Sequence, residues 1–585
     1  MSFIRRVVTL AAAGVVLALP LAAQGIPRGG SIRTTPARAA ARVLVATPYV
    51  FQSTDSAAAV AVGRGIRRQM ERVVGRDYAI IPDTQMNRAL NEFGYPSDAI
   101  LSPLLARTLA LQIQGRYVLT STLNRVDSTS DRFAITARLV GANDDAGYTL
   151  HAVQEPGQDL AAFGQQVAAA FDPAIDALED ARECVTLSQE DPEKAKGEAE
   201  KALKAVPDHG LASYCLAQLA IRDSAGPQQI IPRLQSAVKG DSLSLPAWTL
   251  LAQQYQLAGD TAQMLSAFEN MLRVAPNNQP LREEIFRQFL NLGQIDRAKR
   301  VADEGLKNDP YNAELWDLKS NACLFASDFA CAVESLEQAY AIDSTRADTL
   351  FFTKIAVASE QRLLDTTNVA TSADTAAYLR WTRTGAQRFP ENPTVLSYLA
   401  KAYAVTGQAD SSVAVIRKIA TTDSTGALDA ALGSVQSFAD AGMIDSAGPV
   451  IEFVGERGSV EQKDRLAGLL MQRASQLLQP PTPQYEAAVN LARPAAQMAD
   501  PNGQYYATAN YLFGVAGLQR AAEIDKVAAE QKSCEMAQEE NALLKEAAEA
   551  LPKGREFNAQ TVEQYSGYIS QYLTRSEAMV KSFCG

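Results

Sequence analysis

The residues that could do chemistry in this 585-residue sequence are few, and their types exclude several kinds of site. Only two histidines, His151 and His209, are present, so sites with several imidazole ligands are excluded. The acid pairs Asp144–Asp145 and Glu539–Glu540 could serve acid–base catalysis only if burial or proximity separated their pKa values. One pair falls in a predicted turn and the other on a charged helix, and nothing nearby indicates such a separation. We interpret both histidines as surface or helix-capping residues, His151 after a predicted strand and His209 beside a predicted turn.

Motifs of familiar enzymes do not occur in the sequence. There is no GxxxxGK[ST] phosphate loop, no HExxH and no GxSxG nucleophile elbow. The segment GRGIRR, residues 63–68, places two glycines before basic residues, but it lies within a predicted helix and not at a strand-to-helix turn. We interpret it as a helix face with solvated arginines. The sequence therefore predicts a protein that is not an enzyme and that has no catalytic residues, cofactor or metal site.

The cysteines number six, and an even count is typical of disulfide-bonded exported chains. We predict three pairs of cysteines that are near each other in sequence: Cys184 with Cys215, Cys323 with Cys331, and Cys534 with Cys584. Buried free thiols are the alternative. No CxxC motif occurs, so a thioredoxin-like redox role is not indicated.

The amino-terminal residues have the layout of a secretory signal: Arg5 and Arg6 precede an apolar run at 7–19, and small residues follow at 22–23. We predict a cleavable signal peptide at 1–23, with an uncleaved anchor as the alternative, and a flexible linker at 24–41. No later stretch reaches about 18 uncharged apolar residues, so no membrane span is expected in the mature chain. The predicted localisation is therefore periplasmic or secreted.

The charge balance also limits the partners. Lys and Arg total 55 against 66 Asp and Glu, a net charge of −11, and both signs are mixed along the chain. Because phosphate backbones are bound by concentrated positive charge, nucleic acid is not an expected partner. The length exceeds what one core usually holds, so several domains, or a repeat array with a cap, are expected.

Residues 42–158 show alternating strand and helix patterns. RVLVATPYV and YAIIP read as strands separated by a helical stretch, and two predicted helices follow at 83–93 and 102–112. Three predicted strands joined by polar turns come next, and a helix from Asp159 to about Leu178 closes the unit. This order predicts a small α/β domain with a mixed sheet.

Four phrases of this segment, RVLVATPYV, YAIIPDTQMNRAL, GRYVLTSTL and ITARLVGAN, resemble the TolB amino-terminal-like domain. The resemblance covers roughly residues 42–155. It implies contact with other proteins rather than catalysis, and it supplies no catalytic residues.

A period of 34 residues follows this domain. Pro310 lies 34 residues after Pro276, and Trp316 lies 34 after Arg282, which itself lies 34 after Trp248. The first clear copy places the remaining pattern positions at Leu251, Ala252, Tyr255, Gly259, Phe268 and Pro276. This period and pattern resemble the tetratricopeptide repeat (TPR) family. The resemblance implies stacked antiparallel helical hairpins whose first helices line a concave binding surface.

The expected fold class is therefore α+β and multidomain: a small α/β domain with a mixed sheet, followed by an all-α, TPR-type superhelical solenoid. The expected domains are the signal peptide at 1–23, the linker at 24–41, the TolB-like domain at 42–158, the TPR array at 159–458, and divergent helical repeats with a carboxyl-terminal cap at 459–585. The period is interrupted between Ser344 and Pro390, where we predict an inserted loop around LLDTTNVATSADT.

Polar residues at the inward-facing positions of the best repeats are the candidate binding residues. They are Gln253, Gln256, Glu283, Arg287, Asn291, Glu314, Asp317, Asn321 and Lys401. Their mixed charges suit a protein or peptide segment. We hypothesise a non-enzymatic periplasmic or secreted scaffold that mediates protein–protein interaction in the cell envelope. The alternative is an envelope sensor or transport component whose α/β domain binds a small ligand or glycan. The sequence does not indicate the partner or the oligomeric state.

Overall fold

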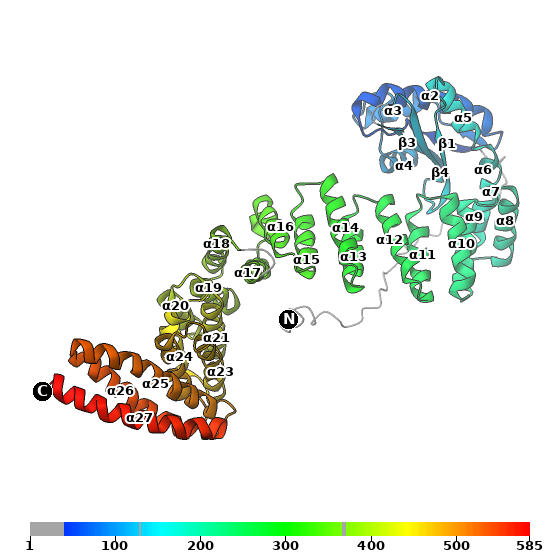
Figure 1. Cartoon of the computed structure of the whole chain (residues 1–585). Helices are drawn as coiled ribbons and strands as arrows, with labels where there is room; N and C mark the ends of the chain where they lie inside the picture. Colours follow the sequence, from blue (N-terminus) through cyan, green and yellow to red (C-terminus); the bar gives the residue numbers. More distant parts are fainter. Residues whose placement is uncertain (1–39, 128–129, 366–369, 585) are drawn as a thin grey trace. The chain divides into compact units, whose positions relative to one another are not determined.

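The computed structural model describes residues 40–127, 130–365 and 370–584 (Figure 1). The predicted signal peptide and residues 24–39 of the predicted linker lie outside the described residues. The chain forms two compact units, with the boundary between Val274 and Ala275. The predicted domain boundaries at 158/159 and 458/459 stay predictions.

The first unit opens with a mixed five-stranded sheet in the order β2-β1-β3-β4-β5. The strands are β1 (Ala41–Val45), β2 (Tyr78–Ile80), β3 (Tyr117–Arg125), β4 (Phe133–Gly141) and β5 (Gly147–Val153). β1 runs parallel to β2 and β3, whereas β3, β4 and β5 are antiparallel neighbours. Short polar connections join the antiparallel strands, and helices make the parallel crossovers. The mixed sheet is the one predicted from the sequence.

Both faces of the sheet are covered by helices. The helices are α2 (Ser56–Val73), preceded by the short η2 (Ser53–Asp55), then α3 (Asp83–Glu92), α4 (Pro103–Gln112) and α5 (Leu160–Ala169). Leu44 and Val118 pack into one core with side chains of α3 and α4. Val43 and Val45 point to the other face and are equally buried, as expected of strands with both faces covered.

The glycines of GRGIRR are packing residues. Gly65 in α2 faces α5 so closely that an added Cβ would lie 2.1 Å from the carbonyl oxygen of Ala161. Gly164 in α5 makes the reciprocal approach, 2.2 Å from the oxygen of Val62. The prediction of solvated arginines is wrong for Arg67, which is buried. Its guanidinium donates to the backbone oxygen of Val45 (3.0 Å) and to Thr47 (2.9 Å), and these hydrogen bonds replace those that it would make to water.

The single helix predicted from Asp159 to about Leu178 is two helices in the structure, and a third begins where it was predicted to end. α5 ends at Ala169, and α6 (Asp172–Asp176) and α7 (Leu178–Leu187) follow. Pro173 lies in the first turn of α6, where its missing N–H costs nothing, but within a continuous helix its ring would clash with the preceding turn. The proline therefore starts a new helix.

Helical hairpins fill the rest of the first unit. They are built from α7 with α8 (Pro192–Ala205), α9 (Gly210–Arg222) with α10 (Pro227–Gly240), and α11 (Leu245–Ala258) with α12 (Thr261–Val274).

The second unit is entirely helical among its described residues. Its helices are α13 (Gln279–Asn291), α14 (Ile295–Asn308), α15 (Ala313–Phe325), α16 (Phe329–Ile342), η3 (Ser344–Arg346), α17 (Thr349–Leu364), α18 (Ser372–Arg388), α19 (Pro393–Val405), α20 (Ala409–Ile419), α21 (Ser424–Asp440), η4 (Ile444–Ala447), α22 (Gly448–Arg457), α23 (Val460–Leu477), α24 (Tyr485–Met498), α25 (Tyr506–Gln531), α26 (Cys534–Ala550), η5 (Leu551–Gly554) and α27 (Arg555–Phe583). Residues 366–369 of the predicted inserted loop lie outside the described residues. Within the described ranges, every helix is too short or too polar to traverse a lipid bilayer.

One hydrogen bond recurs at the 34-residue period. The indole N–H of Trp316 donates to the backbone oxygen of Pro310, six residues earlier, at 2.9 Å. Trp248 makes the same bond to Ser242 at 2.9 Å. Arg282 occupies the equivalent position between them, and its guanidinium donates to the oxygen of Pro276 at 2.6 Å. A donor that ties the helix to the preceding turn is thus the shared requirement at this position, and Trp and Arg both meet it.

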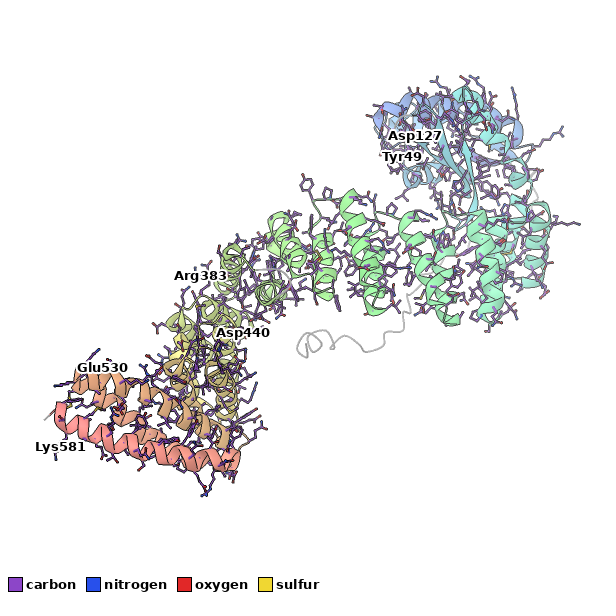
Figure 2. The ribbon with its side chains drawn as sticks, in the orientation of Figure 1. Tyr49, Asp127, Arg383, Asp440, Glu530 and Lys581 are labelled. Carbon is purple, nitrogen blue, oxygen red and sulfur yellow. A yellow bond between two sulfur atoms is a disulfide. The ribbon has the colours of Figure 1, made fainter. Side chains whose placement is uncertain are left out.

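Three disulfides join the cysteines in the predicted pairs. Cys184–Cys215 connects α7 to α9, and Cys323–Cys331 connects α15 to α16. Cys534–Cys584 connects the start of α26 to the end of α27. Glu530 in α25 and Lys581 in α27 lie at this same end of the helices (Figure 2).

The helices and strands described above give the chain the predicted fold class, an α/β domain followed by a solenoid of TPR-like hairpins.

Candidate functional site

A groove in the second unit runs across the first helices of successive hairpins. We call it the first-helix groove, and its volume is about 360 Å³. It is lined by Glu283 of α13, Ala313, Glu314, Asp317 and Leu318 of α15, Ala339, Tyr340 and Asp343 at the end of α16, Arg346, Ala347 and Asp348 of the connection, and Leu350, Phe351 and Lys354 of α17. Three of the predicted binding residues, Glu283, Glu314 and Asp317, therefore share one site.

Helix caps position the elements that carry these side chains. The Asn278 side chain accepts from the N–H of Leu281 (3.1 Å) and starts α13. Asn312, 34 residues later, caps α15 in the same way. The periodic Asn residues thus start both first helices at equivalent places, as expected of residues that satisfy free N–H groups at helix starts.

The connection before α17 departs from this pattern. Four residues, 309–312, join α14 to α15, whereas six residues, 343–348, join α16 to α17. Ser344 stands where the two preceding repeats have Pro276 and Pro310, and a 3-10 turn, η3, forms there. Asp348 then caps α17 by accepting from the N–H of Phe351 at 2.8 Å. The longer connection brings Asp343, Arg346 and Asp348 to the rim of the groove.

Two ion pairs cross the groove. The guanidinium of Arg346 lies 2.8 Å from the Glu314 carboxylate. The Lys354 ammonium pairs with Asp317 and also donates to the side-chain oxygen of Asn321 at 3.2 Å. Lys354 is largely buried, whereas the acids of both pairs remain about 40% exposed: 39% for Glu314 and 41% for Asp317. The carboxylates are therefore accessible to a ligand.

An aromatic cluster supports one wall. The Tyr340 ring stacks against Phe351 with centroids 5.7 Å apart and meets Trp381 edge-on at 5.0 Å. The Trp381 indole N–H donates to Glu337 at 2.8 Å, which fixes its ring. Interlocked aromatic contacts of this kind hold the wall in one conformation. The groove thus has a preformed apolar side and an acidic side.

Asn321 contacts the groove residue Lys354, as described above, and the other five predicted binding residues lie elsewhere. Arg287 is exposed on α13 and pairs with Glu284 of the same helix at 2.6 Å, while Asn291 is exposed at the end of that helix. Lys401 on α19 pairs with Glu360 of α17 at 3.2 Å. The last two residues, Gln253 and Gln256, are exposed on α11 in the first unit. The binding role of all nine residues stays a prediction.

Sequence reasoning missed the part of the groove that follows Asp317. These residues are Tyr340, Asp343, Arg346, Asp348, Leu350, Phe351 and Lys354. The period does not bring these side chains to one site, because the substitution of Ser344 for proline and the two additional residues displace α17 from the 34-residue frame. The sequence signal that could have predicted this part of the groove is the run of acidic and apolar residues just before and at the start of α17: Asp343, Asp348, Leu350 and Phe351.

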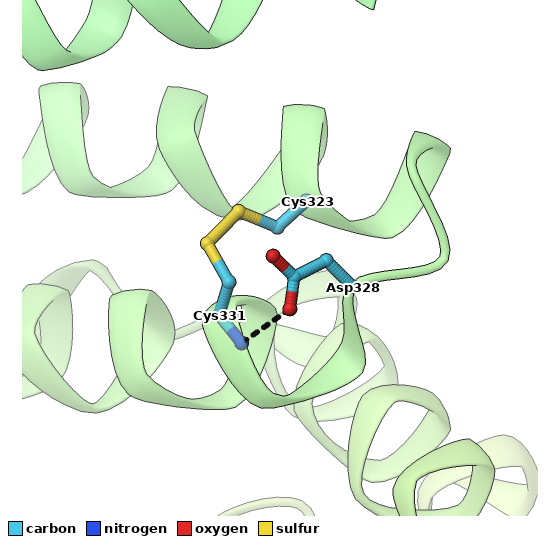
Figure 3. Close-up of side chains that lie close together, drawn as sticks. All are labelled: Cys323, Asp328 and Cys331. Carbon is cyan, nitrogen blue, oxygen red and sulfur yellow. Dashed lines mark hydrogen bonds between the residues drawn. A yellow bond between two sulfur atoms is a disulfide. The ribbon is translucent and has the colours of Figure 1, made fainter. Parts of the chain in front are cut away.

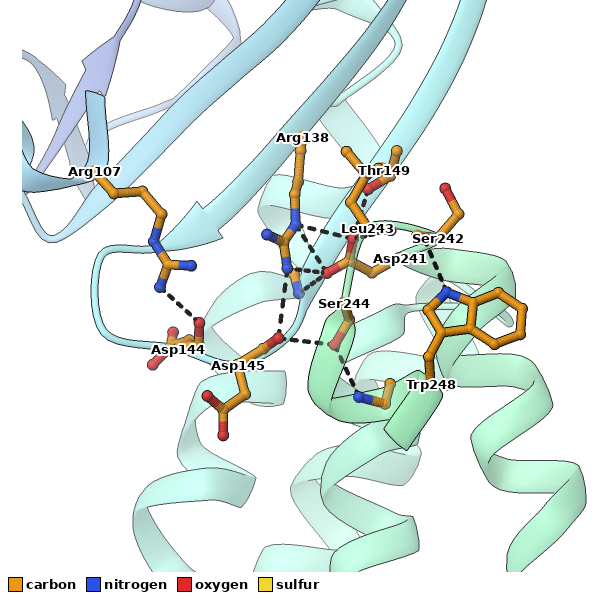
Figure 4. A network of polar contacts seen from close by, with 12 residues as sticks. Arg107, Arg138, Asp144, Asp145, Thr149, Asp241, Ser242, Leu243, Ser244 and Trp248 are labelled. Atoms are coloured by element: carbon orange, nitrogen blue, oxygen red, sulfur yellow. Dashed lines mark hydrogen bonds and ion pairs between the residues drawn. The ribbon is translucent and has the colours of Figure 1, made fainter. Parts of the chain in front are cut away.

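A second polar cluster lies in the first unit, where side chains of the sheet meet residues that follow α10 (Figure 4). Asp241 follows α10 and is fully buried. Its carboxylate accepts from Arg138 of β4 (2.7 Å), from the N–H of Gly147 (2.7 Å) and from the hydroxyl of Thr149 (2.7 Å). Ser244 donates to the backbone oxygen of Asp145 at 2.8 Å. This network holds the sheet against the helical hairpins and is structural.

The histidines lie beside this network. His209 is the N-cap of α9, as one of the two sequence interpretations expected, but it is fully buried, and burial lowers its pKa to about 4. His151 lies within β5 and not after it, and its ring contacts the Thr136 hydroxyl at 2.9 Å. A neutral buried cap and an exposed strand residue do not form a catalytic set.

The interpretation of the acid pairs needs correction. Burial raises the pKa of Asp144, which pairs with Arg182 at 2.9 Å. Burial, and then the nearby Asp525, raise the pKa of Glu540 to about 7. The sequence around Glu540 does not indicate this raised pKa. Glu540 lies in α26 and is buried by the packing of that helix with α25 and α27, which a local sequence pattern does not predict. Neither acid opens onto a groove described above.

The Cys323–Cys331 disulfide lies beside Asp328 (Figure 3). Three potential ligand atoms of these residues lie within 4.8 Å of one another. However, the sulfurs are bonded to each other, and the Asp328 carboxylate caps α16 through the N–H of Cys331 (3.2 Å) and pairs with Lys299 (3.3 Å). Because metals bind thiolates, this arrangement is a cross-link.

A much smaller cavity lies between the α/β domain and α7. Its volume is about 60 Å³, and Tyr78, Arg116, Tyr117 and Arg182 are among its lining residues. Sites for small organic ligands usually enclose about 300–1,000 Å³. The cavity therefore gives no support to the alternative of a ligand-binding sensor.

Comparison with known proteins finds solved structures of low similarity. No protein-family model matches the chain, and no curated protein is significantly similar to it. Similar solved structures include the Naa15/Naa10 complex bound to HypK-THB (14% identity over 69% of this chain and 68% of that chain, TM-score 0.35). PilW, a widely conserved type IV pilus biogenesis factor, is 16% identical over 39% of this chain and 98% of that chain, with a TM-score of 0.26. A tetratricopeptide repeat protein from Parabacteroides merdae is 12% identical over 48% of this chain and 93% of that chain, with a TM-score of 0.24. At these values nothing about function follows from the similarity.

Proposed function

We propose that this chain is a non-enzymatic scaffold that binds polypeptide segments of partner proteins along the first helices of its repeats. The observation that carries the proposal is the first-helix groove, which residues of α13, α15, α16 and α17 line and which contains Glu283, Glu314 and Asp317. Its volume of about 360 Å³ falls in the range of sites that hold ligands with most of their surface buried. Its mixture of apolar and polar lining suits side chains that alternate along an extended segment.

We further propose that the scaffold acts outside the cytoplasm, on partners in the cell envelope. The signal-like pattern at 1–23 supports export. Three disulfides among six cysteines support an oxidising compartment. In this proposal residues 42–158 form a TolB-like contact domain, 159–458 form the repeat array, and 459–585 form the divergent repeats and cap.

A peptide library displayed on phage tests the binding proposal on the full-length chain. A photo-crosslinking amino acid replaces Leu350 in the groove or, as the matched control, Val460 at the start of α23; these side chains are 55% and 61% exposed. We expect selected peptides to crosslink at position 350 and not at 460. Failure to select any peptide, or equal crosslinking at both positions, would contradict the proposal.

A further inference from the structure

The lining of the first-helix groove carries an excess of negative charge. Five carboxylates face it, against two basic side chains, Arg346 and Lys354. Both bases are already engaged in ion pairs, Arg346 with Glu314 and Lys354 with Asp317. The remaining carboxylates, Glu283, Asp343 and Asp348, have no ion-pair partner within 4.0 Å among the described residues.

These three carboxylates are oriented by neutral donors. The amide of Gln279 donates to Glu283 at 3.0 Å. The backbone N–H and the hydroxyl of Thr345 donate to Asp343 at 3.0 and 2.6 Å, and this hydrogen bonding lowers the pKa of Asp343. Asp348 accepts from the N–H of Phe351. Each donor fixes one oxygen without adding a full positive charge, so the carboxylates retain free lone pairs for a ligand.

The apolar wall lies among the acids. Leu350 is 55% exposed and lies two positions after Asp348 in the sequence. An exposed aliphatic group between carboxylates is matched by a ligand that carries both apolar and cationic side chains.

We propose that the groove selects a polypeptide segment in which Lys or Arg residues flank an apolar side chain. The proposal rests on the proposed scaffold function and specifies its partner. The cationic side chains meet Glu283, Asp343 and Asp348, and the apolar side chain packs on Leu350 against the wall supported by Tyr340. Charge complementarity of this kind favours the cationic segment over neutral and acidic ones of the same shape.

Three isosteric substitutions remove the charge and keep the fold. Gln at position 283 still accepts from Gln279, and Asn at 343 and 348 still accepts the local backbone N–H groups, because Asn serves as a helix cap as well as Asp. The test variant is therefore Glu283→Gln, Asp343→Asn and Asp348→Asn in one chain. The matched control makes the same change in charge at exposed acids outside the groove: Asp410→Asn, Asp445→Asn and Glu461→Gln.

Fluorescence anisotropy of the full-length chain with three labelled peptides of alternating residues, Lys/Leu, Gln/Leu and Glu/Leu, tests the proposal. We expect the Lys/Leu peptide to bind tightest and its affinity to fall about tenfold in the test variant, but less than about twofold in the control. If the Gln/Leu peptide binds as tightly and crosslinks at position 350, the scaffold function stands and the cationic specificity is wrong. Equal loss in both variants would also overturn the specificity. If no peptide of any charge binds, both proposals fail.

Discussion

Two acidic clusters of this molecule use the same residue types in opposite ways. In the first unit, Asp241 is fully buried, and the donors of Arg138, Gly147 and Thr149 surround its carboxylate. In the first-helix groove, the carboxylates are partly exposed and outnumber the bases. A buried charge is tolerated only when it is fully paired, whereas an exposed and unbalanced one attracts a ligand. The structural cluster and the candidate binding site therefore differ in whether every carboxylate has enough donors and bases around it.

The largest expected effect follows from breaking the buried cluster. In Asp241→Ala, the Arg138 guanidinium, whose side chain is only 12% exposed, loses its fully buried carboxylate partner, so we expect a loss of about 3 to 5 kcal/mol in the stability of the first unit. Hydrogen exchange of the β4 and β5 amides in the full-length chain measures this loss as faster exchange.

Asp145→Ala provides the matched control for that variant. Asp145 is exposed in the same connection, and its backbone oxygen, not its side chain, joins the network. We expect a change within about 0.5 kcal/mol. Equal protection of β4 in Asp241→Ala and Asp145→Ala would show that the network does not stabilise the unit.

A third acid, Glu540, differs from both clusters because it is buried but not paired. Neither carboxylate oxygen of Glu540 has a hydrogen-bond partner among the described residues. Asp525 of α25 and Arg575 of α27 face it, and Arg575 lies 3.0 Å from Asp525. The pKa of Glu540 is about 7 in the folded chain, against an ordinary value of 4.5. Folding therefore favours the protonated acid, and the stability of this region falls as the pH rises from about 4.5 to about 7.

Glu540→Gln is expected to remove this pH dependence. Above pH 7 the variant should be more stable than the parent by up to about 3 kcal/mol, and below pH 4.5 the two should be alike. Calorimetry of the full-length chain at several pH values measures the difference. Glu539→Gln, at the exposed neighbouring position, is the control and should follow the parent. A parallel pH dependence in Glu540→Gln and the parent would contradict this assignment.

The smallest expected effect concerns the turn between α15 and α16. Ser327 has a φ of +58°, while Gly293, 34 residues earlier, has a φ of +69° in the equivalent turn. Glycine adopts this left-handed conformation without strain, so Ser327→Gly should stabilise the hairpin by about 0.5 to 1 kcal/mol. The reverse change, Gly293→Ser, should destabilise its own hairpin by a similar amount. Thermal denaturation of both variants tests the pair, and a lower melting temperature for Ser327→Gly would refute the equivalence.

The sequence predicted the repeats better than it predicted the site. The period placed Trp248, Arg282 and Trp316 at equivalent positions because one hydrogen bond to the preceding turn is needed in each copy. It failed at α17, where a longer connection shifts the helix and brings Asp343 and Asp348 to the groove. Periodicity reports what successive copies share, whereas a binding site is made where one copy differs. Burial of single acids, such as Glu540, depends on packing between helices and has no local signature.

The most direct test of the central claim is hydrogen exchange of the full-length chain with and without a saturating Lys/Leu peptide. The account predicts slower exchange confined to 279–364, the span of α13 to α17, with the strongest protection in the connection at 343–348 and the first turn of α17. Protection that falls instead on the α/β domain, or that is absent from 279–364 while the peptide is bound, would contradict it.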